Sequence, residues 1–173
     1  MKKLLTILFV TAITFLPFSI QSLYAQSFQE EDLVINAGIG LGTTFSTFNA
    51  NFGLPIGAGI EYGITTLESG SIGFGGDVGF VSGSGITMTT FGIRGSYYFT
   101  ELLELDEPNL DTYAGLGIYY RNFSYENTTI DWGSGAYAAF HVGARYYFSE
   151  SVGAYAEIGN NWGWFNLGVV LDI

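Results

Sequence analysis

The side chains able to carry catalysis or bind a metal are few in this sequence of 173 residues. It contains no cysteine and one histidine, His141. A metal site with a single imidazole and no thiolate would have to be built almost wholly from carboxylates. As a catalytic base, the imidazole would need a nucleophile beside it and an acid to orient it. We therefore predict that His141 is a polar contact within the fold and that the chain has no catalytic, metal or cofactor site.

Five charged residues are the other candidates, because each interrupts a segment that is otherwise apolar or small. They are Glu61, Asp77, Arg94, Arg145 and Glu157. Acidic and basic groups held close together could form a structural ion network, or they could line a path for ions. Which role applies depends on the elements that position them.

These residues lie in segments where apolar residues alternate with small or polar ones at a period of two. That period is typical of β-strands, whose successive side chains point to opposite faces. Clusters of Gly, Ser, Asn, Asp and Thr between the segments predict turns. The predicted strands are residues 33–41, 56–64, 72–80, 91–99, 112–121, 137–148, 152–159 and 165–173.

The composition decides which face of these strands meets which solvent. Of the residues, 48% are hydrophobic, only 12% are charged, and 25 are glycine. A soluble surface usually carries roughly a quarter to a third charged residues, which this chain lacks. The apolar face is therefore assigned to lipid, and the glycine-rich face to a narrow interior that eight strands leave just wide enough for side chains. We predict an all-β fold: an eight-stranded antiparallel up-and-down transmembrane β-barrel with a filled, narrow lumen.

Within such a barrel the five charged residues fall at similar depths. Counted from the inner end of each strand, Glu61 and Arg145 lie three residues up, and Asp77, Arg94 and Glu157 lie five residues up. At ~3.3 Å per residue and a tilt of about 40°, they occupy a layer roughly 8–13 Å from the boundary. Charges in a dry interior are stable only when paired. The prediction is a structural ion network, with an ion path or gate as the alternative.

The first 25 residues predict a cleaved secretory signal peptide. Met1-Lys2-Lys3 is positively charged, residues 4–20 are mostly apolar, and Ala25 is a small residue at the cleavage point. The mature chain, residues 26–173, keeps three arginines and no lysine against 16 acidic residues, a formal charge of −13. This balance argues against nucleic acid as a partner.

Two of the predicted strands end in the same aromatic pattern, Tyr97-Tyr98-Phe99 and Tyr146-Tyr147-Phe148. The alternation places Tyr97, Phe99, Tyr146 and Phe148 on the lipid face. Aromatic side chains form a girdle where such a face meets the membrane–water boundary. An even strand count after an exported N-terminus places both termini, and this girdle, on the periplasmic side.

The connections outside the strands carry most of the remaining acidic residues. Gly42–Leu54 and Asn122–Gly135 are the long predicted outer loops. The inner turn 100–109 contains four acidic residues, and we interpret it as a solvated turn. A periplasmic docking point or a weak divalent-cation site is the alternative, because oxygen ligands are permissive for such ions.

With this alternation, strand count, aromatic ends and N-terminal signal, residues 32–173 resemble the small outer-membrane β-barrels of the porin family, such as OmpX and the membrane domain of OmpA. The resemblance implies a bacterial outer-membrane protein in contact with lipid and lipopolysaccharide. It also implies insertion by the barrel assembly machinery, which reads an alternating terminal strand such as 165–173. That family usually ends in an aromatic residue, where this chain has Ile173. Barrel lipid A deacylases carry a His-x-Ser pair with an acid, whereas Gly143 follows His141 at the position of the serine.

The leading functional hypothesis is a non-enzymatic structural or interaction protein, or a subunit of a larger envelope complex. Envelope protein partners would bind the outer loops or the acidic 100–109 turn. The alternatives are a narrow ion or small-solute channel and a lipid-modifying barrel enzyme. Because only Arg121 lies near the outer boundary, lipopolysaccharide phosphates would be bound through bridging divalent cations.

Overall fold

The computed structural model describes residues 28–43, 53–83, 85–103, 107–126 and 133–173. The predicted signal peptide and most of the predicted Gly42–Leu54 loop lie outside these residues. The elements are β1 (Leu33–Leu41), β2 (Ile56–Leu67), β3 (Gly70–Gly83), β4 (Ile86–Tyr98), the 3-10 turn η1 (Glu101–Leu103), β5 (Leu110–Tyr125), β6 (Gly135–Tyr147), β7 (Val152–Gly159) and β8 (Phe165–Asp172).

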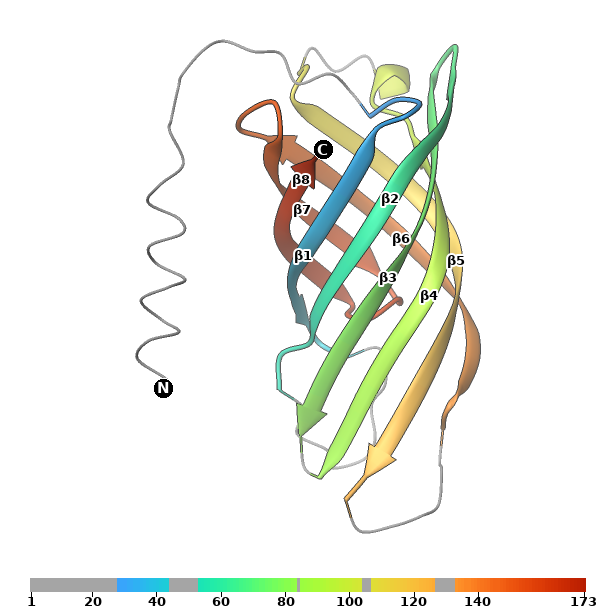
Figure 1. Ribbon diagram of the computed structural model, residues 1–173, viewed down its shortest axis with the longest axis vertical. Coiled ribbons are helices and arrows are strands. Elements are labelled where there is room, and N and C mark those ends of the chain that lie inside the picture. Colours follow the sequence, from blue (N-terminus) through green and yellow to red (C-terminus); the bar gives the residue numbers. More distant parts are fainter. Residues whose placement is uncertain (1–27, 44–52, 84, 104–106, 127–132) are drawn as a thin grey trace.

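The strands form one closed sheet (Figure 1). Each strand pairs antiparallel with its neighbour in the chain, and β8 pairs with β1 to complete the ring. The predicted eight-stranded antiparallel barrel is confirmed. Closure satisfies the backbone groups of every strand within the sheet and leaves no free edge along the common length. No helix in the described part of the chain is long and apolar enough to cross a membrane.

The two ends of the barrel differ in their connections. The end that carries the β2–β3, β4–β5 and β6–β7 connections, the start of β1 and the end of β8 is called here the turn end, and it is uppermost in Figure 1. The opposite end, with the other four connections, is the loop end. There β3, β4 and β5 extend beyond the other strands. The residues of β3 from Val81 onward have no partner on β2, and those of β5 from Asn122 onward have no partner on β6.

Several strands are longer than the alternation predicts. β2 continues to Leu67 and β3 begins at Gly70, because a register shift between Gly63 and Thr65 interrupts the period of two. At the loop end, β3 and β4 run past the predicted strand limits at residues 80 and 91 and stay paired as far as Gly83 and Ile86. The start of the predicted Asn122–Gly135 loop is likewise strand, since β5 extends to Tyr125.

The two faces of the wall separate the apolar residues from the charged ones. Large apolar side chains on the outward face are exposed, as at Leu116 (72%), Ile118 (66%) and Val78 (54%). Every charged residue of the eight strands belongs to the inward-facing set. This arrangement is the reverse of a soluble barrel.

Inward-facing glycines lie opposite the bulkiest inward side chains. Gly115 pairs with His141, and a Cβ at Gly115 would approach the imidazole to 2.5 Å. Gly143 pairs with Tyr113, and a Cβ there would lie 2.6 Å from the phenol oxygen. The glycines thus provide the space in which a narrow lumen holds aromatic and charged groups.

Candidate functional site

Arg94 on β4 lies at the centre of the lumen and binds two carboxylates. Its Nη1 is 3.2 Å from Asp77 Oδ2 on β3, and its Nη2 is 2.7 Å from Glu157 Oε2 on β7. All three side chains are at least 95% buried. The Tyr113 hydroxyl also donates to Glu157 Oε2, at 3.1 Å. This group joins four strands, β3, β4, β5 and β7, across the lumen.

Arg145 on β6 forms a second ion pair, nearer the turn end. Its Nη2 donates to Glu61 Oε2 at 2.8 Å, and both side chains are 1% exposed. Aromatic rings surround the guanidinium, whose Cζ lies 4.8 Å from the Tyr113 ring centroid and 5.2 Å from that of Tyr98. Such rings attract a cation electrostatically. Each ion pair therefore joins charged residues that lie the same number of residues from the inner end of their predicted strands, three for this pair and five for the Arg94 group.

The connection between β7 and β8 folds into the lumen from the loop end. Asn161 is fully buried, and its Nδ2 donates to Glu157 Oε1 at 2.8 Å and Asp77 Oδ2 at 3.2 Å. The indole of Trp162, 2% exposed, packs against the paired glycines Gly57 and Gly79, where a Cβ would collide with it. We call Asn161 and Trp162 the loop-end plug.

Residues Phe28–Asp32 precede β1 at the turn end, and Phe28 among them enters the lumen. We call them the N-terminal segment. Phe28 is 3% exposed and stacks on Tyr98 with 4.2 Å between ring centroids. The ring belongs to a buried cluster that closes this end around Val34, Tyr147 and Val170. Non-strand residues therefore fill the lumen from both ends.

His141 lies within the lumen and contacts a serine that the sequence reasoning missed. Its Nε2 is 2.9 Å from Ser96 Oγ on β4, two strands away. The two residues are 1% and 3% exposed, so a substrate has no access to them. Among the described residues no group hydrogen-bonds His141 Nδ1, the position that an orienting acid would occupy. The contact is a polar link inside the wall.

The four predicted girdle residues lie near the turn end in two neighbouring pairs. The rings of Tyr97 and Phe99 are 6.4 Å apart, and those of Tyr146 and Phe148 are 6.2 Å apart. Tyr146 and Phe148 are 45% and 63% exposed. Tyr97 donates its hydroxyl to the carbonyl of Ser69 at 2.8 Å.

The acidic turn begins with η1 and lies at the same end. Leu102 and Leu103 are 62% and 46% exposed. Residues 104–106 are outside the described part of the chain, and within that part no group of three His, Asp or Glu residues is placed to hold a metal ion.

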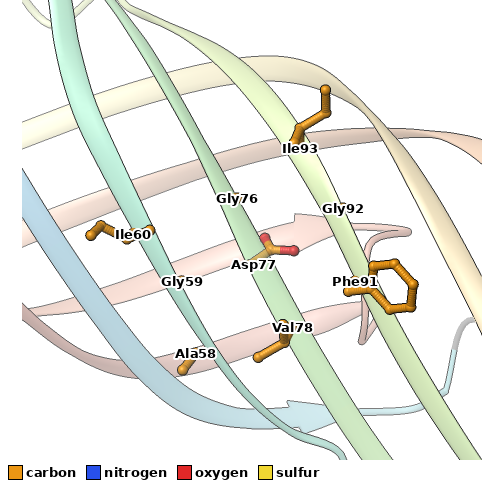
Figure 2. Close-up of a pocket in the computed structure, with 9 residues that line it drawn as sticks. All are labelled: Ala58, Gly59, Ile60, Gly76, Asp77, Val78, Phe91, Gly92 and Ile93. Atoms are coloured by element: carbon orange, nitrogen blue, oxygen red, sulfur yellow. The ribbon is translucent and has the colours of Figure 1, made fainter.

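The outward face carries shallow grooves where small residues interrupt the apolar surface. One, of about 480 Å³, lies over β2, β3 and β4 (Figure 2). Ala58, Ile60, Val78, Phe91 and Ile93 surround Gly76 there. The exposed lining is almost wholly apolar, because the carboxylate of Asp77 beneath the groove is buried and pairs with Arg94 in the lumen. This groove therefore suits lipid chains.

Comparison with known proteins supports the fold and nothing narrower. No family model matches the sequence. No curated protein matches it either.

Solved structures do match the model. The N-terminal β-barrel domain of Pseudomonas aeruginosa OprF aligns over 84% of this chain and 100% of its own, with a TM-score of 0.57 and 18% identity. A de novo designed transmembrane β-barrel aligns over 86% of this chain and 100% of its own, with a TM-score of 0.53 and 16% identity. Pseudomonas aeruginosa OprG, an outer membrane protein, aligns over 86% of this chain and 98% of its own, with a TM-score of 0.51 and 11% identity. The chain therefore has the fold of the small outer-membrane β-barrels, as its sequence resemblance implies.

Proposed function

We propose that the protein is an integral outer-membrane barrel with a closed lumen that acts as a structural or interaction protein. The outward face supports the membrane setting, because its large apolar side chains are exposed and its strands present no charged residue to the outside. Six of the eight strands have 9 to 16 residues, which meets the about 9–11 tilted residues that cross the hydrocarbon layer; β7 and β8 have 8 each.

The observation that carries the proposal is the occupied lumen. The Arg94–Glu157 and Arg145–Glu61 ion pairs cross the lumen between strands that are not neighbours, Trp162 fills the loop end, and Phe28 fills the turn end. A conducting path would have to break buried ion pairs, and removing one partner of such a pair costs roughly 3–5 kcal/mol. Both the channel and the lipid-modifying enzyme are therefore weaker candidates, the latter because His141 and Ser96 are enclosed.

In this proposal the turn end faces the periplasm and the loop end faces outward. Lipid and lipopolysaccharide surround the wall, and the barrel assembly machinery inserts the chain. Envelope protein partners bind either the loop-end extension of β3–β5 or the acidic turn with its exposed Leu102 and Leu103. The extension offers exposed polar side chains such as Ser82 and Ser124.

Two experiments test this function. In planar lipid bilayers the purified chain should give no single-channel steps; reproducible steps that change with Glu61→Gln or Arg94→Gln would show that ions pass the lumen. In intact cells, a photo-cross-linking residue at Ser124 or Glu101 should capture a protein. The matched control is Val142, 50% exposed on the outward face, which should capture only lipid. Protein adducts from Val142 alone would contradict binding at the barrel ends.

A further inference from the structure

The N-terminal segment is held by side-chain and backbone groups of three strands, not only by apolar contact. The Phe28 N–H donates to Asp111 Oδ1 on β5 at 3.2 Å, and the Ser71 hydroxyl of β3 donates to the Phe28 carbonyl. Further along, the Glu30 N–H donates to Thr66 Oγ1 on β2 at 3.0 Å. The hydrogen-bonding groups of the Phe28 backbone are thus satisfied by the barrel wall.

The segment then pairs with β2 as a short strand would. The Glu31 N–H donates to the Gly63 carbonyl at 3.0 Å, and the Gly63 N–H donates to the Asp32 carbonyl at 2.9 Å. Glu31 adopts a positive φ of 75°. A non-glycine residue keeps this conformation only where its surroundings impose it. The reciprocal hydrogen bonds with Gly63 provide that constraint.

The wall is shaped to receive this segment. Gly63 and Gly73 face each other across β2 and β3. A Cβ at Gly63 would overlap the carbonyl of Gln29, and one at Gly73 would lie 3.0 Å from Cε1 of Phe28. A larger residue at Gly63 would therefore exclude the segment's backbone, and one at Gly73 would crowd the Phe28 ring. The glycine pair, with Tyr98 as the stacking partner and Asp111 and Ser71 as polar partners, makes a defined site.

We propose that the turn-end mouth of the barrel is a peptide-binding site whose resident ligand is the N-terminal segment. The site recognises one aromatic side chain and the backbone that follows it. It is indifferent to the acidic side chains of Glu30 and Glu31, which are exposed. The bound segment covers Arg145, whose guanidinium Cζ lies 5.6 Å from the Phe28 ring centroid, and so shields the Arg145–Glu61 pair from the turn end.

Thiol labelling of the full-length chain tests the site, since the sequence has no cysteine of its own. The reporter is Ser96→Cys, at a buried position that pairs with Gly73 beside the segment. A second reporter, Thr90→Cys, lies beyond Arg94 on the same strand, where a Cβ at Gly79 would meet both Thr90 and Trp162. Both should be protected in the otherwise unaltered chain.

Two variants displace the N-terminal segment, one by altering the segment and the other by altering the barrel wall. Phe28→Ala removes the aromatic ligand, and Gly63→Ala blocks the site with a Cβ. Either should raise the labelling rate at Ser96→Cys by roughly a hundredfold, because the buried ring no longer holds the segment in place. The Thr90→Cys reporter should stay protected, which shows that the rest of the barrel is folded. The matched control is Gly95→Ala, where an outward Cβ meets nothing nearer than 3.9 Å.

A peptide with the sequence of residues 26–32 separates ligand from site. In excess, it should restore protection to the Phe28→Ala chain but not to the Gly63→Ala chain, whose site is blocked. The same peptide carrying Phe28→Ala should restore neither. The proposal is overturned if Ser96→Cys stays protected in both variants, if Thr90→Cys becomes equally reactive, or if the two peptides protect equally well.

Discussion

The Arg145–Glu61 pair allows the energetic role of the lumen charges to be measured. Arg145→Met leaves the Glu61 carboxylate buried without its partner, and Glu61→Gln removes the carboxylate that pairs with the Arg145 guanidinium. Removing one member of a buried pair costs roughly 3–5 kcal/mol. We expect Arg145→Met to be the more damaging, because it also loses the contacts with Tyr98 and Tyr113, worth about 0.5–2 kcal/mol for a desolvated cation over a ring.

The double variant should be far more stable than the sum of the two losses predicts. With both charges removed, neither member of the pair is left buried without its partner, and replacing a buried pair by apolar or neutral groups is often close to neutral. The expected coupling free energy is on the order of 2–3 kcal/mol, the upper range for residues in direct contact.

Equilibrium unfolding in urea, in lipid vesicles, gives the free energies for this cycle. Tryptophan fluorescence is a suitable signal because Trp162 is buried in the lumen and becomes solvated when the barrel opens. Additive losses, with a coupling energy within about 0.5 kcal/mol of zero, would refute the reasoning, since they would mean that neither charge depends on the other.

Two further predictions concern how the lumen is filled. Trp162→Ala should lower the free energy of unfolding by about 3–5 kcal/mol, since it empties the space over Gly57 and Gly79. Trp164 is 48% exposed, so Trp164→Ala should change the free energy of unfolding by less than about 1 kcal/mol. The midpoints of urea unfolding compare the two variants directly. Gly115→Ala should prevent folding or destabilise the barrel severely, because the Cβ would collide with the Gly95 carbonyl and approach the His141 ring to 2.5 Å. The Cβ of Gly135→Ala meets nothing within 4 Å, so this variant should leave the free energy of unfolding unchanged or raise it by up to about 1 kcal/mol. Equal effects of the two alanines would contradict the space-filling role of the glycines.

The architecture could be predicted because the sequence pattern and the membrane both act on single strands. Alternation assigns each side chain to a face without any knowledge of its neighbours, and a charge count then decides which face meets lipid. Strand ends fix depth to within a residue or two, so the five charged residues could be placed in one layer, although their division into two ion-paired groups could not be predicted. The full lengths of β2, β3 and β4 could not be predicted either, because the register shift after Gly63 breaks the period of two and because Ser and Thr residues at the loop end interrupt the apolar alternation.

The site at the turn end and the loop-end plug depend on pairing between strands, which a single strand's pattern does not contain. Gly63 and Gly73 are two more inward glycines until the register sets them opposite each other. Once opposed, they leave the wall without side chains at that point, and close packing requires another group to occupy the space.

Opposed inward glycines whose space another side chain fills occur at more than one place in the barrel. Gly57 opposes Gly79 under Trp162, Gly38 opposes Gly168 under the ring of Tyr155, and Gly38 also opposes Gly57 between these two rings. Of the three aromatic side chains that fill these spaces, Trp162 comes from a turn and Phe28 from the N-terminal segment, whereas Tyr155 belongs to β7. Opposed inward glycines in a narrow barrel are therefore a signal, readable once pairing is known, for where a non-strand segment enters the lumen and closes it.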